Sequence, residues 1–413
     1  MKYGCIGKSL SHSYSKEIHA RLSAEPYELF ELNEGELTDF FQTRDFCGIN
    51  VTIPYKETVI PYLDALDESA KAVGAVNTIV NDGGSLVGYN TDFYGLGALL
   101  SRMGVSLQGK TVVILGSGGT SKTAVALARA QGAREVLVVS RTKGKGDLVY
   151  GDLHTVAKDA EILIQTTPVG MYPHDEDCPV ALEDFAKLEA VVDAVYHPLR
   201  TRLVVEAEAK GIKAAGGLYM LVSQAARSAS LFHGTSYGDK TIETIYRSLA
   251  KEKENLVLVG MPSSGKSTVG RLVAERLGRS FYDLDEEVGR LTGKIIPELF
   301  LEGGEALFRA AEKSVVGELS KMTGIVLATG GGTPLSEENL FALRRNGSLW
   351  LLDRPLEELT PTEGRPLANS REALEKLYYE RMPRYRAICD RRIAVCGDPK
   401  TLAETLEHEW RKA

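Results

Sequence analysis

The clearest feature of the hydrophobic and polar pattern is a pair of apolar runs that each lead into a glycine turn and then a helical pattern. One run covers Lys110 to Gly116, and the other covers Asn255 to Gly260, with helical periodicity from Val269 to Leu277. An apolar run of this length followed by glycines and a helix is typical of a buried strand that ends at a phosphate-binding turn. The pattern therefore predicts two nucleotide-binding sites in one chain.

Shorter alternations of apolar strands and helical stretches fill the region before residue 110. Strands are predicted over Leu29–Leu32, Gly48–Ile53 and Thr78–Val80. The segment Thr91–Met103 is predicted to be a helix that joins two lobes, and Leu218–Leu231 a helix that returns to the first lobe. We therefore expect two α/β lobes around a cleft.

The charged stretch from Arg247 to Asn255 interrupts the hydrophobic period. We place a domain boundary there, near residue 252, and expect a further α/β domain with a parallel sheet after it. The expected division is a first domain over 1–252, with one lobe over 1–93 and 218–252 and another over 94–217, and a second domain over 253–413.

Composition and charge narrow the class of protein. A hydrophobic content of 43% with 25% charged residues is ordinary for a globular protein, so each part can bury a core. The net charge of −7 argues against nucleic-acid binding through bulk electrostatics. The N-terminal residues contain no apolar stretch long enough for export or for spanning a membrane. We therefore expect a cytoplasmic protein without nucleic-acid or membrane partners.

The cysteines support the same setting. They are odd in number and scattered, without the paired spacing of a metal site, which indicates reduced thiols. The five positions are Cys5, Cys47, Cys178, Cys389 and Cys396.

The turn after the first apolar run predicts a dinucleotide site. Its glycines let the backbone approach a pyrophosphate, and the following helix presents free amides. The next strand ends at Arg141, where an acidic residue would suit a free ribose hydroxyl, so a guanidinium there favours NADP over NAD. An ordinary glycine turn and a solvated Arg141 remain the alternative. The predicted cofactor residues are Gly116, Ser117, Gly118, Gly119, Arg141 and Thr142.

The turn after the second apolar run matches a complete phosphate-binding loop, Gly260 to Thr268. Lys266 is expected to draw charge from the β- and γ-phosphates of ATP, and the Ser267 hydroxyl to bind Mg2+. The loop predicts a nucleotide but leaves the phosphate acceptor open. The residues predicted to hold the nucleotide are Ser263, Ser264, Gly265, Lys266, Ser267 and Thr268.

Ordered motifs in the first 250 residues resemble shikimate dehydrogenase. They begin at Gly7, Asn50, Gly74, Gly88, Gln165, Asp193 and Gly216. The resemblance implies a Rossmann NADP lobe beside a substrate lobe, with Lys56 and Asp92 as the catalytic pair. It implies that the Lys56 ammonium gives a proton to the carbonyl oxygen of 3-dehydroshikimate while NADPH delivers a hydride.

The same resemblance implies the remaining contacts of this site. The implied substrate residues are Ser13, Ser15, Thr52, Asn77, Asp92, Tyr196 and Gln224, and the nicotinamide side is lined by Ala194, Gly217 and Met220. Taken singly, the serines also suit turns, Asp92 suits a helix cap and Met220 suits the core.

Two departures from the family pattern stand out. Lys16 follows Ser15 where the family usually has proline, which leaves that helix start less constrained. From Thr142 to Ile162 the chain is too short for the usual helix, strand and second helix, so one crossover helix is expected to be lost. Binding on the Arg141 flank is therefore expected to be weaker or built differently.

The last part of the chain, from residue 255, resembles shikimate kinase in motifs that begin at Phe281, Gly303, Ala328, Gly364 and Glu380. The resemblance implies Asp283 in the magnesium shell, Asp285 at the acceptor hydroxyl, and Arg365 reaching the transferred phosphate. Arg309 and Arg381 would clamp the substrate carboxylate with forked donors, and backbone at Gly331 would approach the substrate. Thr360 stands where an adenine-bracing arginine is expected, so adenine binding is expected to differ.

The two resemblances together predict a bifunctional enzyme. It would reduce 3-dehydroshikimate to shikimate with NADPH and then phosphorylate shikimate with ATP. A metabolite-sensing regulator is the rival, and the retained Lys56, Asp92, Lys266 and Asp285 argue against it, as does the lack of a DNA-binding helix pair. A preference for quinate or NAD is a further alternative. The sequence predicts neither the oligomeric state nor a channel between the sites.

Overall fold

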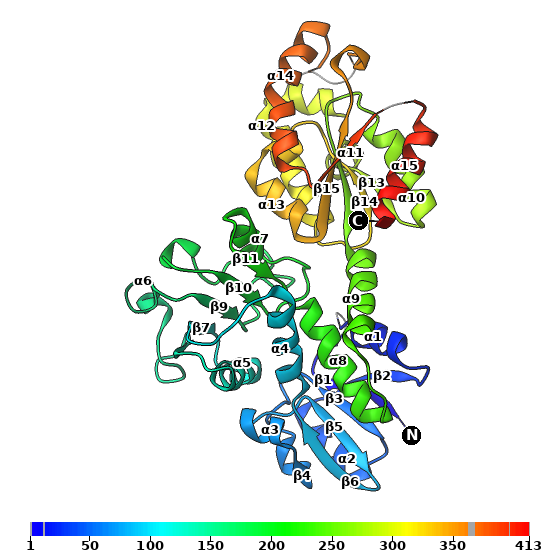
Figure 1. The fold of residues 1–413 in the computed structure, drawn as a ribbon. Helices are drawn as coiled ribbons and strands as arrows, with labels where there is room; N and C mark the ends of the chain where they lie inside the picture. Colours follow the sequence, from blue (N-terminus) through cyan, green and yellow to red (C-terminus); the bar gives the residue numbers. More distant parts are fainter. Residues whose placement is uncertain (1, 11–12, 362–367, 396, 413) are drawn as a thin grey trace. The chain divides into compact units, whose positions relative to one another are not determined.

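The computed structural model describes residues 2–10, 13–361, 368–395 and 397–412. The chain forms two compact units, over residues 1–250 and 251–413 (Figure 1). The predicted boundary near residue 252 falls within the helix α9, Asp239–Lys253. Each unit is an α/β structure.

The first lobe of the N-terminal unit is built on a mixed six-stranded sheet with the order β2-β1-β3-β5-β6-β4. β1 lies parallel to β2 and β3, whereas β5 is antiparallel to β3 and β6. Its strands are β1 Tyr3–Gly7, β2 Tyr27–Glu31, β3 Gly48–Val51, β4 Ala65–Leu66, β5 Thr78–Asp82 and β6 Ser85–Tyr89. Its helices are α1 Ser15–Leu22, η1 Glu34–Glu36, α2 Leu37–Thr43, η2 Ile60–Tyr62 and α3 Glu68–Val73.

The second lobe has a fully parallel five-stranded sheet with the order β11-β10-β9-β7-β8. The strand order reverses between β7 and β9, and ligands of such sheets bind in the crevice at the carboxyl ends of the strands beside that point. The strands are β7 Thr111–Leu115, β8 Glu135–Val139, β9 Ile162–Gln165, β10 Ala190–Asp193 and β11 Lys213–Ala215. The helices are α5 Gly119–Ala130, η3 Tyr150–Asp152, α6 Leu153–Val156, η4 Leu182–Asp184 and α7 Arg202–Ala209.

The connection from β8 to β9 is as short as the sequence indicates, with only η3 and the four-residue α6 inside it. β8 is therefore an edge strand. A short return segment covers part of that edge: Asp147 N donates to Val138 O over 2.8 Å, and Ser140 N donates to Leu148 O over 3.0 Å. The Asp147 carboxylate also accepts from Val138 N at 2.8 Å. Backbone groups that a further strand would pair are thus satisfied locally.

Two helices join the lobes: α4 covers Thr91–Met103, and α8 covers Leu218–His233 (Figure 1). They pack closely because Gly95 faces α8, where a Cβ would lie 2.6 Å from Met220 O. Leu96 and Leu99 of α4 are buried in a core that includes Val222 and Ala225 of α8. This shared core brings side chains of α8 to the first lobe.

The C-terminal unit has a parallel five-stranded sheet with the order β13-β14-β12-β15-β16. Its strands are β12 Asn255–Val259, β13 Phe281–Asp283, β14 Val326–Ala328, β15 Gly347–Asp353 and β16 Arg391–Ala394. Its helices are α10 Lys266–Leu277, α11 Leu284–Thr292, α12 Ile296–Leu319, η5 Thr333–Leu335, α13 Glu337–Asn346, η6 Leu356–Glu358, α14 Arg371–Ile388 and α15 Pro399–Lys412.

Both faces of this sheet are buried. Along β12, Val257 and Val259 join one apolar cluster, whereas Leu256 and Leu258 join another on the opposite face. A strand buried on both faces is expected to be continuously apolar rather than alternating, as β12 is from Leu256 to Val259. Over the described part of the chain, no helix combines the length and the apolar character that crossing a membrane requires.

Candidate active sites

Lys56 and Asp92 meet in the N-terminal unit. Lys56 follows β3, and Asp92 lies in the first turn of α4, whose start is capped by Asn90. The Lys56 Nζ lies 2.6 Å from Asp92 Oδ2, and the two side chains are 14% and 10% exposed. A Cβ on Gly119, at the start of α5, would lie 3.4 Å from Lys56 Cδ. The ion pair therefore stands beside the glycine turn of the second lobe.

Asn77 and Gln224 come together although 147 residues separate them. Asn77 Nδ2 donates to Gln224 Oε1 at 3.3 Å and to Thr91 Oγ1 at 3.0 Å, and Asn77 Oδ1 accepts from Thr91 N at 2.7 Å. All three side chains are buried. Because both amides have fixed partners, their orientations are set, as positioning a polyhydroxylated ligand would require.

A polar network that the sequence motifs do not reveal lies behind these amides. Asn50 Nδ2 donates to Ser228 Oγ at 2.8 Å, and Asn50 Oδ1 accepts from the Tyr27 hydroxyl at 2.7 Å. Thr78 and Thr91 each lie within hydrogen-bond distance of Ser228. Asn50 and Thr91 lie in the same sequence motifs as the predicted site residues Thr52 and Asp92. Their positions were a usable signal, because a buried polar side chain needs partners.

The other predicted substrate residues gather at the ends of β1 and β3. Ser13 Oγ lies 3.1 Å from Ser15 Oγ, and Thr52 follows β3, where its backbone N donates to Ile6 O at 3.0 Å. The centroid of the Tyr196 ring lies 5.3 Å from that of Tyr14, which is the residue between Ser13 and Ser15 in the sequence. Burial raises the pKa of Tyr196 to about 12, so its hydroxyl is neutral at pH 7.

The start of α1 has Lys16 where the family pattern usually has a proline. Tyr14 occupies the cap position and makes no side-chain cap hydrogen bond, and Lys16 is exposed. Tyr14 is instead held from the second lobe, because its hydroxyl lies 3.0 Å from His197 Nδ1.

The glycine turn of the second lobe suits a dinucleotide. Gly116 has a φ of +109°, and a Cβ there would lie 2.8 Å from Thr166 Oγ1. Gly118 caps α5 with open space around its Cα. On the opposite side, a Cβ on Gly217 would lie 2.3 Å from Ala194 O. Backbone at Gly118 is thus open to a pyrophosphate, which would meet the free amides at the start of α5.

Arg141 and Thr142 lie just past the end of β8 and are exposed. Thr142 N donates to Ser140 Oγ at 3.2 Å, and Ser140 Oγ lies 3.4 Å from the hydroxyl of Ser117 in the glycine turn. Arg141, predicted at the 2′-phosphate, and Thr142, predicted to bind the cofactor, therefore lie on the same edge of the second lobe as the glycines.

A carboxylate that the sequence reasoning did not use lies at the end of β10. Asp193 is fully buried and accepts hydrogen bonds from Val195 N at 2.9 Å and Thr201 Oγ1 at 2.6 Å. Burial raises the pKa of Asp193 to about 7 despite these two bonds. The side chain holds the turn that carries Ala194 and Tyr196.

In the C-terminal unit the phosphate-binding loop joins β12 to α10. Gly260 and Gly265 have φ of +147° and +93°, which side chains rarely adopt. Lys266 is buried, and its Nζ donates to Gly260 O at 2.9 Å and Met261 O at 2.8 Å. Ser264 is buried, Ser267 is half-buried and Thr268 is exposed. The loop is thus wrapped around its own lysine.

Asp283 and Asp285 flank the start of α11. Asp283 ends β13, and its Oδ1 accepts from Asp285 N at 3.0 Å. In the described residues there is no group of three or more His, Cys, Asp or Glu that could hold a metal. Mg2+ beside nucleotide phosphates needs only one or two protein oxygens. The Ser267 hydroxyl and the Asp283 carboxylate are the donor types that fit it.

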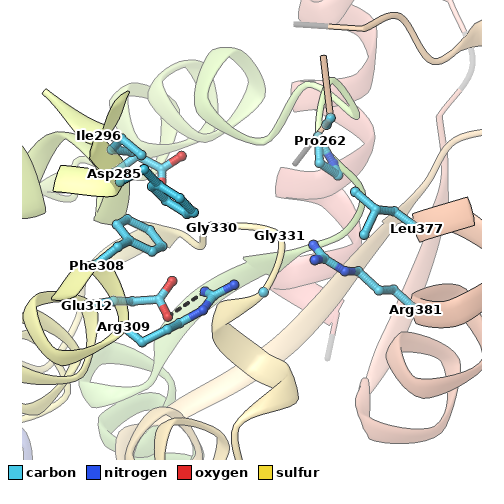
Figure 2. A pocket seen from close by; sticks show the side chains of 13 residues that line it. Pro262, Asp285, Ile296, Phe308, Arg309, Glu312, Gly330, Gly331, Leu377 and Arg381 are labelled. Carbon is cyan, nitrogen blue, oxygen red and sulfur yellow. Dashed lines mark hydrogen bonds and ion pairs between the residues drawn. The ribbon is translucent and has the colours of Figure 1, made fainter. Parts of the chain in front are cut away.

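Arg309 on α12 and Arg381 on α14 face one another across a cavity (Figure 2). Glycines lie between them: a Cβ on Gly331 would lie 3.2 Å from Arg381 Nη1, and one on Gly332 would lie 2.4 Å from Arg309 Nη2. Asp285 lies in the same cavity. The lining residues are Pro262, Asp285, Ile296, Phe300, Phe308, Arg309, Glu312, Gly330, Gly331, Gly332, Ala368, Leu377 and Arg381.

Glu312 was not assigned a role from the sequence, and it holds Arg309 in place (Figure 2). Its Oε2 accepts from Arg309 Nη1 at 2.8 Å, and its Oε1 accepts from the Thr333 hydroxyl at 2.6 Å. The Glu312 side chain is 2% exposed. Burial disfavours the charged form of Arg309, but the carboxylates of Glu312 and Glu305 outweigh it and raise the pKa of Arg309.

Arg365 lies outside the described residues. Thr360, five positions earlier and in the position where an adenine-bracing arginine was expected, is exposed. Its backbone carbonyl accepts a hydrogen bond from Ser263 Oγ of the phosphate-binding loop at 2.6 Å.

Two family models match the chain. A model of the shikimate dehydrogenase substrate-binding domain matches residues 5–79, and a shikimate kinase model matches residues 262–409. The first covers the segment with Ser13, Thr52, Lys56 and Asn77. The second begins in the phosphate-binding loop and covers Arg309 and Arg381.

Relatives and solved structures agree over the N-terminal part. The chain is 35% identical over 265 residues to an NADP(+) shikimate dehydrogenase of Clostridium perfringens, covering 60% of this chain and 97% of the relative. It is similar to a chorismate mutase/shikimate 5-dehydrogenase fusion from Clostridium acetobutylicum, with a TM-score of 0.56, 35% identity, and coverage of 60% and 96%. It is also similar to a shikimate 5-dehydrogenase of Thermus thermophilus in complex with NADP(H) and shikimate, with a TM-score of 0.54, 32% identity, and coverage of 60% and 99%.

Proposed function

We propose that this chain, which belongs to the shikimate dehydrogenase family over its N-terminal part and carries a shikimate kinase domain at residues 262–409, joins two consecutive reactions. The first is the NADPH-dependent reduction of 3-dehydroshikimate to shikimate. The second is the ATP-dependent phosphorylation of shikimate to shikimate 3-phosphate. The chain is thus a bifunctional enzyme of the shikimate pathway.

One observation carries this proposal: each unit brings together the side chains that are proposed for its own reaction. The N-terminal unit pairs Lys56 with Asp92 at 2.6 Å beside the glycine turn. The C-terminal unit places Arg309 and Arg381 in one cavity with Asp285. A regulator that had lost both activities would not need to keep these side chains close together.

In the first reaction NADPH supplies the hydride. Lys56 donates a proton from Nζ to the carbonyl oxygen that is being reduced, and the developing alkoxide becomes a hydroxyl. Asp92 accepts a hydrogen bond from the same Nζ, which orients the ammonium toward the carbonyl oxygen. Both side chains are mostly buried, so bulk water competes little for this proton.

Recognition of the carboxylic acid in this site rests on neutral donors. The hydroxyls of Ser13 and Ser15 lie 3.1 Å apart and suit the two oxygens of a carboxylate. Asn77 and Gln224, held by their buried partners, suit ring hydroxyls. Thr52 and Tyr196 complete the proposed set. Gly116 to Gly119, Arg141, Thr142, Ala194 and Gly217 are the residues that would hold NADP(H).

In the second reaction ATP with Mg2+ supplies the phosphoryl group. Asp285 accepts the proton of the attacking hydroxyl, while Arg309 and Arg381 hold the acceptor carboxylate from opposite walls of the cavity. Lys266 and the amides of the loop carry the negative charge of the phosphates, and Ser267 and Asp283 would bind the metal. Arg365 is proposed to reach the transferred phosphate.

Assays of the purified full-length chain test both halves of the proposal. We expect oxidation of shikimate with NADP+, faster than with NAD+ and faster than oxidation of quinate, and phosphorylation of shikimate with ATP and Mg2+. Absence of NADP-dependent turnover would reject the dehydrogenase. Absence of ATP-dependent turnover with shikimate would reject the kinase, and binding of either ligand without turnover would favour a sensor.

A further inference from the structure

Ser263 has an unusual backbone conformation in the phosphate-binding loop. Its φ is +64°, and among the described residues only Arg44 shares a positive φ without being glycine. The left-handed conformation is unfavourable for a residue with a Cβ, because the Cβ approaches the following carbonyl oxygen. Glycine adopts it freely. A serine at this position therefore needs compensating contacts.

Both polar ends of Ser263 are held by one distant segment, residues 354–360. The Ser263 hydroxyl donates to Thr360 O at 2.6 Å, and the Ser263 carbonyl accepts from Arg354 Nη1 at 3.3 Å. These partners lie 97 and 91 residues further along the chain. The first bond requires the serine side chain, so a glycine would lose it.

The segment itself is firmly anchored. Leu359, next to Thr360, is 1% exposed and lies in the apolar cluster that also contains Val257 and Val259 of β12. The Leu359 carbonyl accepts from Arg371 Nη1 at 3.0 Å. Arg354 directly follows β15, the neighbour of β12 in the sheet. The contacts on Ser263 therefore come from a fixed frame.

We propose that Arg354 and the Thr360 carbonyl hold Ser263 in its left-handed conformation, and that Ser263 is thereby a positioning residue for the triphosphate of the nucleotide. The direction of each amide in an anion-binding turn depends on the φ and ψ of the residues before it, and a left-handed residue in such a turn aims successive N–H groups into one concavity. Ser263 precedes the amides of Ser264, Gly265 and Lys266. This inference rests on the kinase activity proposed above.

The position of this contact predicts which substrate it affects. The acceptor cavity contains Arg309 and Arg381, and Ser263 is not among the residues that line it. Loss of the Ser263 hydroxyl is therefore expected to weaken nucleotide binding while leaving the KM for shikimate unchanged.

The test compares Ser263→Gly, Ser263→Ala and Arg354→Lys in the full-length chain, with Ser314→Ala on the exposed face of α12 as the matched control. The measured quantities are the Kd of ATP with Mg2+, the KM for ATP and for shikimate, and the unfolding midpoint. Both Ser263 variants are expected to raise the Kd and KM of ATP roughly three- to tenfold, the range expected for one hydrogen bond. Ser263→Gly is expected to keep or raise the unfolding midpoint, because it removes the strain.

The glycine variant separates positioning from strain. If Ser263 were only a strained loop residue, Ser263→Gly would be more stable and would bind ATP as the unsubstituted chain does, and that result would overturn the inference. Failure of the unsubstituted chain to phosphorylate shikimate would instead reject the proposed function. The Kd of ATP would then still decide the role of Ser263, and a chain that does not bind ATP would overturn both.

Discussion

Lys56 Nζ lies 2.6 Å from Asp92 Oδ2, although the two residues are 36 positions apart in the sequence. The pair is mostly buried, with the two side chains 14% and 10% exposed. An ion pair at this depth costs desolvation free energy that a surface pair does not. Its place beside the glycine turn supports the proposed proton transfer from Lys56.

Replacing Lys56 with alanine is expected to lower kcat for shikimate oxidation by about 10²- to 10⁴-fold, because the general acid is lost. Phosphorylation of shikimate by the same protein is expected to change less than about twofold. Spectrophotometric assays of NADPH formation and of ADP release measure the two rates. The exposed Lys71→Ala is the matched control. Loss of both activities would contradict two independent sites.

Lys266→Ala is expected to have the reverse effect. Removing the buried ammonium from the phosphate-binding loop is expected to lower kinase kcat by about 10²- to 10³-fold, because charge on the phosphates is no longer neutralised. NADP-dependent oxidation is expected to remain. Lys313→Ala removes an exposed lysine of the same unit and serves as control. Kinase turnover unaffected by Lys266→Ala would place the nucleotide elsewhere.

Glu312 and Glu305 contact the same arginine from environments that differ in exposure, and this offers a matched pair. Glu312→Gln is expected to raise the KM for shikimate about tenfold or more, because Arg309 loses a charged partner that is 2% exposed. Glu305→Gln is expected to change that KM less than about threefold, because this pair is solvent-screened. Steady-state kinetics with saturating ATP measure both. Equal effects would mean that burial of Glu312 does not matter for orienting Arg309.

Arg141→Ala tests the choice of cofactor. We expect the KM for NADP+ to rise about tenfold, because a charge-assisted hydrogen bond to the 2′-phosphate is lost. The KM for NAD+, which lacks that phosphate, is expected to stay within about twofold and is the internal control. A parallel rise for both cofactors would show that Arg141 supports the fold of the shortened flank rather than reading the phosphate.

Asp193 is expected to make the stability of the N-terminal unit depend on pH. Its pKa is about 7 in the folded protein against 3.8 for the free side chain, so the folded state holds a proton that the unfolded state has released. Stability from this group therefore falls as pH rises from about 4 to about 7 and is constant above. At about 1.4 kcal/mol per pKa unit, the loss amounts to a few kcal/mol.

Asp193→Asn should remove that dependence. The difference in unfolding midpoint between variant and unsubstituted chain is expected to become more favourable to the variant between pH 5 and pH 8. Thermal unfolding in matched buffers measures it, and Asp159→Asn, at an exposed ion pair, is the control. A difference that does not change with pH would mean that Asp193 ionises normally.

Much of the architecture followed from local pattern. The helix predicted over Thr91–Met103 coincides with α4, and the strands predicted near Gly48 and Thr78 correspond to β3 and β5. The short connection after Arg141 was also evident, because a helix and a strand require a minimum number of residues. These features depend on residues that are close together in the sequence, so the pattern of residue types predicts them.

The sequence by itself determined the two nucleotide-binding turns and the chemistry of the motifs, because glycine spacing and side-chain type are local properties. Only the tertiary structure decided which side chains share a site. It placed Glu312 against Arg309 and Thr333, Asn50 against Ser228, and Ser263 against Thr360. These partners lie on separate elements of each sheet and its helices, and their meeting depends on packing of the whole unit rather than on any single stretch of chain.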